Sequence, residues 1–92
     1  MQFYHTTYTN KEVNHPQFEV RGDKVYATVH NKEAVGKLSQ PWYEIKGNNI
    51  HSTAYNPQGH DVRPMFQIAG DQVYTTVHNP HHTNAAVFNI KK

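Results

Sequence analysis

The chain has 92 residues, no cysteine, eight histidines and a formal net charge of +2. One small domain is expected, held by packing and hydrogen bonds, because disulfides and thiolate metal sites are excluded. No apolar stretch approaches the roughly 20 residues of a membrane span, and the N-terminus lacks the apolar run of a signal peptide, so we expect a soluble, cytoplasmic protein. The basic residues are scattered along the chain, which argues against a nucleic-acid partner.

The same hairpin pattern occurs three times along the chain. The segments "QFEVRGDKVYATVHN", "WYEIKGNNIHSTAYN" and "MFQIAGDQVYTTVHN" align position by position. Glycine followed by aspartate or asparagine is typical of two-residue hairpin turns, and the flanking β-branched and aromatic residues favour strands. The pattern predicts repeats at 17–41, 42–64 and 65–86, connected by loops that contain proline and glycine.

A fourth repeat is split between the two ends of the sequence. Residues 87–92 match the first strand of the pattern, and 1–16 contain the second strand in the same register. Pairing the N- and C-terminal strands would close the sheet and remove its free edges. We therefore predict one all-β domain over 1–92, built of four pseudo-symmetric hairpins with about eight antiparallel strands. A barrel is favoured over a small toroid, because two-stranded blades would bury little surface.

Alternation gives each predicted hairpin an apolar face and a polar, aromatic face. The residues predicted to face the core are Phe18, Val20, Val25, Ala27 and Val29; Tyr43, Ile45, Ile50, Ser52 and Ala54; Phe66, Ile68, Val73, Thr75 and Val77; and Phe88, Ile90, Phe3, His5 and Thr7.

The polar face carries rings at the same positions in every repeat, and these are candidate ligand-binding residues. One level of the ring holds Tyr8, His30, Tyr55 and His78, and the next level holds Tyr4, Tyr26, His51 and Tyr74. If this face points towards a central axis, the side chains converge and could hold a metal ion or an anionic or planar ligand. If it points outwards, the same residues are cross-strand pairs that stabilise a half-exposed sheet.

Four histidines are candidate metal ligands. His30 and His78 lie diagonally across the first level, and His81 and His82 follow His78 in the stretch "HNPHH". Imidazoles bind zinc, but this spacing differs from the familiar zinc patterns and no carboxylate is adjacent to orient the rings. We therefore expect no cofactor, with a metal ion at these histidines as the alternative.

The inventory of reactive groups is small. The two serines lie outside a nucleophile-elbow context, and no glycine-rich phosphate loop precedes a helix. We predict a non-enzymatic binding module that holds a protein partner or a small ligand through its repeated Tyr, His and Thr positions. The first alternative is a lectin-like, carbohydrate-binding module, with Trp42 and Tyr43 as stacking candidates. The second is a structural or oligomerising subunit that forms a homo-oligomer.

The repeat resembles short tandem β-hairpin repeats found in uncharacterised proteins of Gram-positive bacteria and their phages. The resemblance rests on the order aromatic, Ile or Val, Gly-Asp or Gly-Asn, Val or Ile, Tyr or His, Thr, His or Tyr, Asn-Pro, and "WYEIKGNNIHSTAYNPQG" carries it most closely. It covers nearly the whole chain and implies a small bacterial or phage protein. It implies no activity and no catalytic residues.

Overall fold

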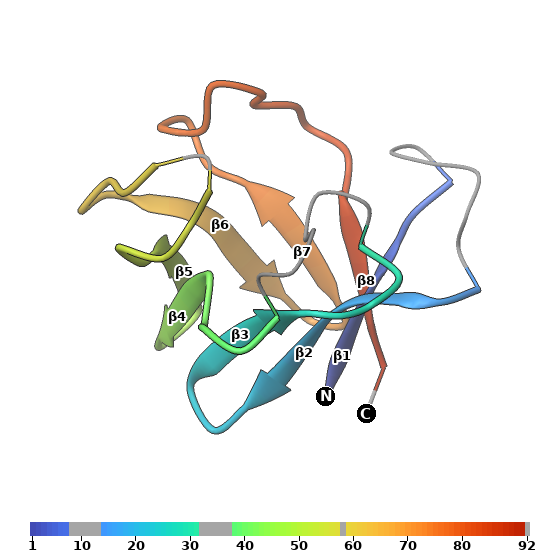
Figure 1. Ribbon diagram of the computed structural model, residues 1–92. Coiled ribbons are helices and arrows are strands. Elements are labelled where there is room, and N and C mark those ends of the chain that lie inside the picture. The colour runs from blue at the N-terminus through green and yellow to red at the C-terminus, as the bar shows by residue number, and fades with distance from the viewer. Residues whose placement is uncertain (8–13, 32–37, 58, 92) are drawn as a thin grey trace.

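The computed structural model describes residues 1–7, 14–31, 38–57 and 59–91. Within these ranges the strands are β1 (Gln2–His5), β2 (Pro16–Arg21), β3 (Lys24–Ala27), β4 (Tyr43–Lys46), β5 (Asn49–Ser52), β6 (Pro64–Ala69), β7 (Gln72–Thr75) and β8 (Phe88–Lys91). Each strand pairs antiparallel with its neighbours in sequence, and β8 returns to β1, so the sheet closes into one barrel (Figure 1). The predicted all-β fold of eight antiparallel strands is confirmed, as a barrel and not a toroid.

The described part of the chain contains no helix of the length and apolarity that a bilayer crossing needs.

Three tight turns connect the strands of the hairpins β2–β3, β4–β5 and β6–β7. Their first central residues are Gly22, Gly47 and Gly70, with φ of 63°, 62° and 62°. No non-glycine residue of the described ranges has a positive φ, so the Asp or Asn that follows each glycine keeps an ordinary backbone. This combination is that of a type II′ turn, whose twist matches the right-handed twist of the flanking strands.

The first and last strands form the seam of the barrel. Gln2 pairs with Lys91, Phe3 with Ile90, and His5 with Phe88. The predicted pairing of the N- and C-terminal strands is confirmed. The two chain ends therefore lie together, at the same end of the barrel as the three hairpin turns (Figure 1).

The interior of the barrel is filled by side chains in layers. Val25, Ile50 and Val73 are at most 1% exposed and form the centre of the core together with Phe3. One partly buried layer packs against them, comprising Val20, Ile45, Ile68 and Ile90. Eight strands enclose a space about wide enough for such side chains. The alternation therefore predicted the inward face of these strands correctly.

The second strand of each hairpin ends before a threonine, which turns the chain. After β7, the Thr76 hydroxyl donates a hydrogen bond to the Pro64 carbonyl and accepts one from the backbone N–H of His78, 3.3 Å away. Asn79 donates its backbone N–H to the Thr76 carbonyl and its side-chain amide to the Met65 carbonyl, each at 3.1 Å. Equivalent contacts are made by Thr28 with Asn31 and by Thr53 with Asn56.

These turns correct one part of the predicted core. Val29 and Val77 were expected inside, yet both are 77% exposed. Ala54 and Thr7 are exposed as well. The prediction was wrong because it extended the alternation past the point where the threonine contacts end each strand.

The two ends of the barrel differ. The hairpin turns and the chain ends lie at one end (Figure 1). The longer connections lie at the other, which we call the mouth. They include the β5–β6 loop, described at 53–57 and 59–63, and the β7–β8 loop at 76–87.

Candidate binding site at the barrel mouth

The core ends towards the mouth in a closed set of four aromatic rings, Phe18, Tyr43, Phe66 and Phe88, which we call the aromatic floor. Consecutive ring centroids are 5.7, 5.5, 6.1 and 5.6 Å apart around the set. Interplanar angles of 62° to 90° make every contact edge-to-face. This is a preferred geometry for aromatic pairs. One ring comes from each of β2, β4, β6 and β8, so the barrel itself positions the floor.

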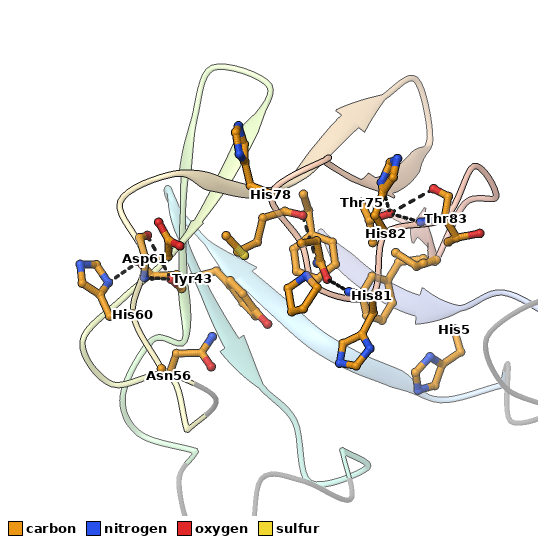
Figure 2. A pocket seen from close by; sticks show the side chains of 18 residues that line it. His5, Tyr43, Asn56, His60, Asp61, Thr75, His78, His81, His82 and Thr83 are labelled. Atoms are coloured by element: carbon orange, nitrogen blue, oxygen red, sulfur yellow. Dashed lines mark hydrogen bonds between the residues drawn. The ribbon is translucent and has the colours of Figure 1, made fainter.

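A pocket of about 900 Å³ is lined by three rings of this floor, those of Tyr43, Phe66 and Phe88, and we call it the mouth pocket (Figure 2). Its apolar lining includes Tyr43, Met65, Phe66, Pro80, Val87 and Phe88. Its polar lining includes His5, Ser52, Asn56, His60, Asp61, Thr75, His78, Asn79, His81, His82 and Thr83. Figure 2 shows His60 and Asp61 at one side of the pocket and His82 and Thr83 at the other. An apolar base beneath a polar rim is typical of small-ligand sites.

Two inward-facing hydroxyls fix the loops that form the rim. Ser52, the last residue of β5, accepts a hydrogen bond from the Asp61 N–H at 2.8 Å and donates one to the Asp61 carbonyl at 3.2 Å. Thr75, the last residue of β7, accepts from the Thr83 N–H at 2.9 Å and donates to the Thr83 carbonyl at 3.1 Å. The two loops are therefore attached to the barrel by the same pair of contacts.

The residue preceding each anchored position is a histidine. His60 Nδ1 lies 2.9 Å from the Ser52 carbonyl oxygen, which can only accept, so Nδ1 carries the proton. His82 Nδ1 lies 3.2 Å from Thr75 Oγ1. In a charged imidazole both nitrogens carry a proton, so Nδ1 of a protonated His82 donates to this hydroxyl oxygen. In the neutral His60 ring, Nε2 is then the nitrogen without a proton.

The carboxylate of the rim is held in a close ion pair. Arg63 NH2 lies 2.8 Å from Asp61 Oδ2, and Arg63 Nε and backbone N lie 3.2 and 2.9 Å from Oδ1. The hydrogen bonds from the Arg63 side chain and backbone hold the pKa of Asp61 well below its usual range, and the nearby His78 acts in the same direction. Asp61 is therefore ionised at any ordinary pH, and its charge is balanced by Arg63.

The second level of predicted ligand-binding residues lies on the outer surface of the barrel. Tyr4, Tyr26, His51 and Tyr74 alternate with the inward residues of β1, β3, β5 and β7, and all four are half-buried. Their neighbours are other side chains of the sheet and nearby loop backbone. The Arg21 guanidinium lies 4.6 Å from the Tyr26 ring centroid and the Lys91 ammonium 4.7 Å from that of Tyr4. These residues do not converge on an axis.

The first level falls in the turns beyond the strands. A threonine directly follows β3, β5 and β7, and two residues after it come His30, Tyr55 and His78. All three are exposed. His30 stacks on His15 with ring centroids 4.4 Å apart, while His78 lines the mouth pocket. Tyr8 lies outside the described residues. The three described residues of this level lie in turns and not on strands as predicted, because each strand ends before it reaches them.

The four candidate metal ligands do not all line the mouth pocket. His78, His81 and His82 line the mouth pocket, and His30 is not among the described residues that do so. Within the described ranges, no three His, Cys, Asp or Glu side chains form a group suited to a metal ion. Proximity in sequence in "HNPHH" thus does not bring the three imidazoles to one point.

Trp42 was proposed as a stacking surface for sugars, and the structure contradicts this. Its side chain is 2% exposed, and its ring packs edge-to-face on Phe18 with centroids 5.8 Å apart. Its backbone joins β3, since Trp42 N–H donates to the Val25 carbonyl at 2.8 Å. Trp42 immediately precedes β4 and belongs to the buried core of the barrel.

Sequence reasoning missed the mouth pocket although it named much of its lining. Tyr43, Phe66, Phe88, His5, Ser52 and Thr75 were all assigned to the core face. One available signal was that His5, Ser52 and Thr75 are polar residues at inward positions, each at the last residue of its strand. Polar groups at equivalent inward positions indicate that this layer of the barrel meets water or a ligand.

Comparison with family models, curated proteins and solved structures finds no match to this chain.

Proposed function

We propose that the protein is a non-enzymatic binding module whose ligand site is the mouth pocket. The observation that carries this proposal is the pocket itself, about 900 Å³ at the open end of a closed barrel. Small-ligand sites commonly have volumes of about 300–1,000 Å³ and occur at the mouths of β-barrels. The aromatic floor offers apolar surface, and the rim offers a few polar groups that can orient a ligand.

The attachment of the loops supports a preformed site. Ser52 and Thr75 each make both a donor and an acceptor bond to loop backbone. A loop that is already ordered loses less conformational freedom when a ligand binds, which raises affinity. The same bonds occupy the hydroxyls of Ser52 and Thr75, and this favours a binding role over a nucleophilic one for these two residues.

The alternative functions receive less support. For a lectin-like role, Trp42 cannot stack on a sugar because it is buried in the core. Tyr43 still contributes its ring to the floor of the pocket. A role as an oligomerising subunit would rest on exposed side chains such as Val29, Val62 and Val77, which are dispersed over separate turns and loops. The resemblance to hairpin-repeat proteins remains a prediction and is compatible with any of these roles.

Mapping by ¹⁵N–¹H NMR with soluble aromatic probes, such as indole and 2-naphthol, tests the proposal. We expect shifts concentrated at the aromatic floor and the β5–β6 and β7–β8 loops. His81→Trp should weaken binding about tenfold by placing a bulky ring at the rim. Val77→Trp is the matched control, since Val77 lies in the same loop and is 77% exposed. No shifts at all, or shifts confined to the outer face around Tyr26 and Tyr74, would contradict the proposal.

A further inference from the structure

The charge of the mouth pocket depends on histidine. Five histidines line it, contributed by β1 and by both rim loops: His5, His60, His78, His81 and His82. Among the described lining residues, Asp61 is the one carboxylate, and none is a lysine or an arginine. Histidine is the side chain whose charge ordinarily changes between about pH 5 and 8. Acid therefore changes the electrostatic character of this pocket more than that of a site lined by lysine or glutamate.

The single carboxylate does not cancel the charge that acid would bring. Asp61 is already bound by Arg63 through both of its oxygens, at 2.8 and 3.2 Å. The Asp61–Arg63 pair contributes no net charge to the rim. Each proton taken up by a rim histidine thus makes the pocket more positive.

The His60 and His82 rings are held in position by contacts at Nδ1. His60 Nδ1 donates to the Ser52 carbonyl, and His82 Nδ1 lies 3.2 Å from Thr75 Oγ1. Protonation at Nε2 adds a second N–H donor to a ring that need not move, because its Nδ1 contact is kept in the charged form. An anion receives charge-assisted hydrogen bonds from such donors, which are stronger than neutral ones.

We propose that the mouth pocket takes a small aromatic anion, with a planar apolar body on the floor and a carboxylate, sulfonate or phosphate group at the histidine rim. This inference rests on the proposed function and names its ligand class. Binding is coupled to proton uptake, since an anion favours the charged form of a neighbouring imidazole. Affinity therefore rises as pH falls from about 8 to about 5.5 and is weakest where the histidines are neutral.

Three naphthalene probes that differ in charge test the proposal by titration calorimetry on the intact chain at low salt. They are naphthalene-2-sulfonate, neutral 2-naphthol and the 2-naphthylmethylammonium cation. From about pH 8 to about pH 5.5, we expect the sulfonate to bind about tenfold more tightly, naphthol to change less than about twofold, and the cation to weaken. Sulfonate titrations in two buffers of different ionisation enthalpy should also reveal net proton uptake.

Substitutions of single histidines and of a histidine pair test whether the pH dependence of sulfonate binding arises in the mouth pocket. The double variant His78→Gln, His81→Gln removes two of the five lining histidines, so it should lose part of the pH dependence for the sulfonate and still bind naphthol. His30→Gln is the matched control, because His30 occupies the turn position equivalent to His78 but does not belong to the described pocket lining.

The outcomes separate the two proposals. If naphthol binds in the mouth but sulfonate affinity does not change with pH, or the His30 variant loses the pH dependence instead, the anion proposal is overturned and the proposed function stands. If none of the three probes binds at either pH, the proposed function fails and the anion proposal fails with it.

Discussion

At the scale of single residues, the ion pair at the rim ties the stability of the fold to pH. The pKa of Asp61 is depressed in the folded chain by its hydrogen bonds to Arg63. A carboxyl group with a depressed pKa stabilises the folded state above its unfolded pKa of about 4, and this contribution is lost as pH falls towards the folded value.

We expect Asp61→Asn to flatten the decline in melting temperature between about pH 4 and about pH 2. Arg63→Gln should flatten it in a similar way, because it removes the main cause of the pKa shift. Thermal unfolding followed by circular dichroism across this range measures the slope. Curves for the two variants that run parallel to that of the parent would show that the pair has no part in acid stability.

A second prediction at this scale concerns Thr76, the residue that directly follows β7. Thr76→Val removes the hydroxyl that binds the Pro64 carbonyl and the His78 N–H while keeping the shape of the side chain. The contact to the Pro64 carbonyl is part-buried and that to the His78 N–H is exposed, so water can partly replace the hydroxyl. The free energy of unfolding should therefore fall by about 0.5–1.5 kcal/mol.

Denaturant unfolding measures the change. The reverse substitution at the next residue, Val77→Thr, is the control and should stay within about 0.5 kcal/mol of the parent, since Val77 is exposed. Equal stability of the Thr76→Val variant and the parent would mean that the turn is held by its other contacts.

At the scale of elements, the hairpin turns depend on glycine backbone and not on space. Gly70 has a φ of 62°, and a Cβ added there would meet no atom within 4 Å. Gly70→Ala should therefore destabilise the barrel by about 1 kcal/mol through backbone strain alone.

Chemical denaturation again gives the value, with Asp71→Ala as the matched control. Asp71 is the other central residue of the same turn and has no positive φ. Equal effects of the two substitutions would contradict the type II′ assignment.

The strands could be predicted from the sequence, whereas their ends and the mouth pocket could not. The strands from Val25 and Val73 were predictable, because alternation and a glycine turn are local signals. Their ends were not, since the bond from Thr76 to Pro64 spans twelve residues and depends on the neighbouring strand. The site was missed for a related reason. Ser52 and Thr75 occupy inward positions like core residues. Their polarity was a signal, but the loops they bind and the pocket they line follow from closure of the barrel.

At the scale of the whole molecule, the closed sheet should tolerate a change of chain order. Gln2 and Lys91 are paired across the seam, so a short Gly-containing turn can join the two ends. We expect a circular permutant, joined there and opened between Gly47 and Asn48, to form the same barrel. Its ¹⁵N–¹H NMR spectrum should match that of the parent except near the old and new ends. A spectrum without dispersed amide signals would mean that the β4–β5 turn must be intact for folding.

The seam has a further consequence, for the order of folding and for self-association. Every other strand pair joins neighbours in sequence, whereas β1 and β8 bring together the two ends of the described chain. Closing so large a loop is entropically costly, which makes this the slow pairing. A molecule opened at the seam exposes two strand edges that already match each other. Two such molecules can close on one another, so refolding at high concentration would yield a domain-swapped dimer with every native strand pairing preserved.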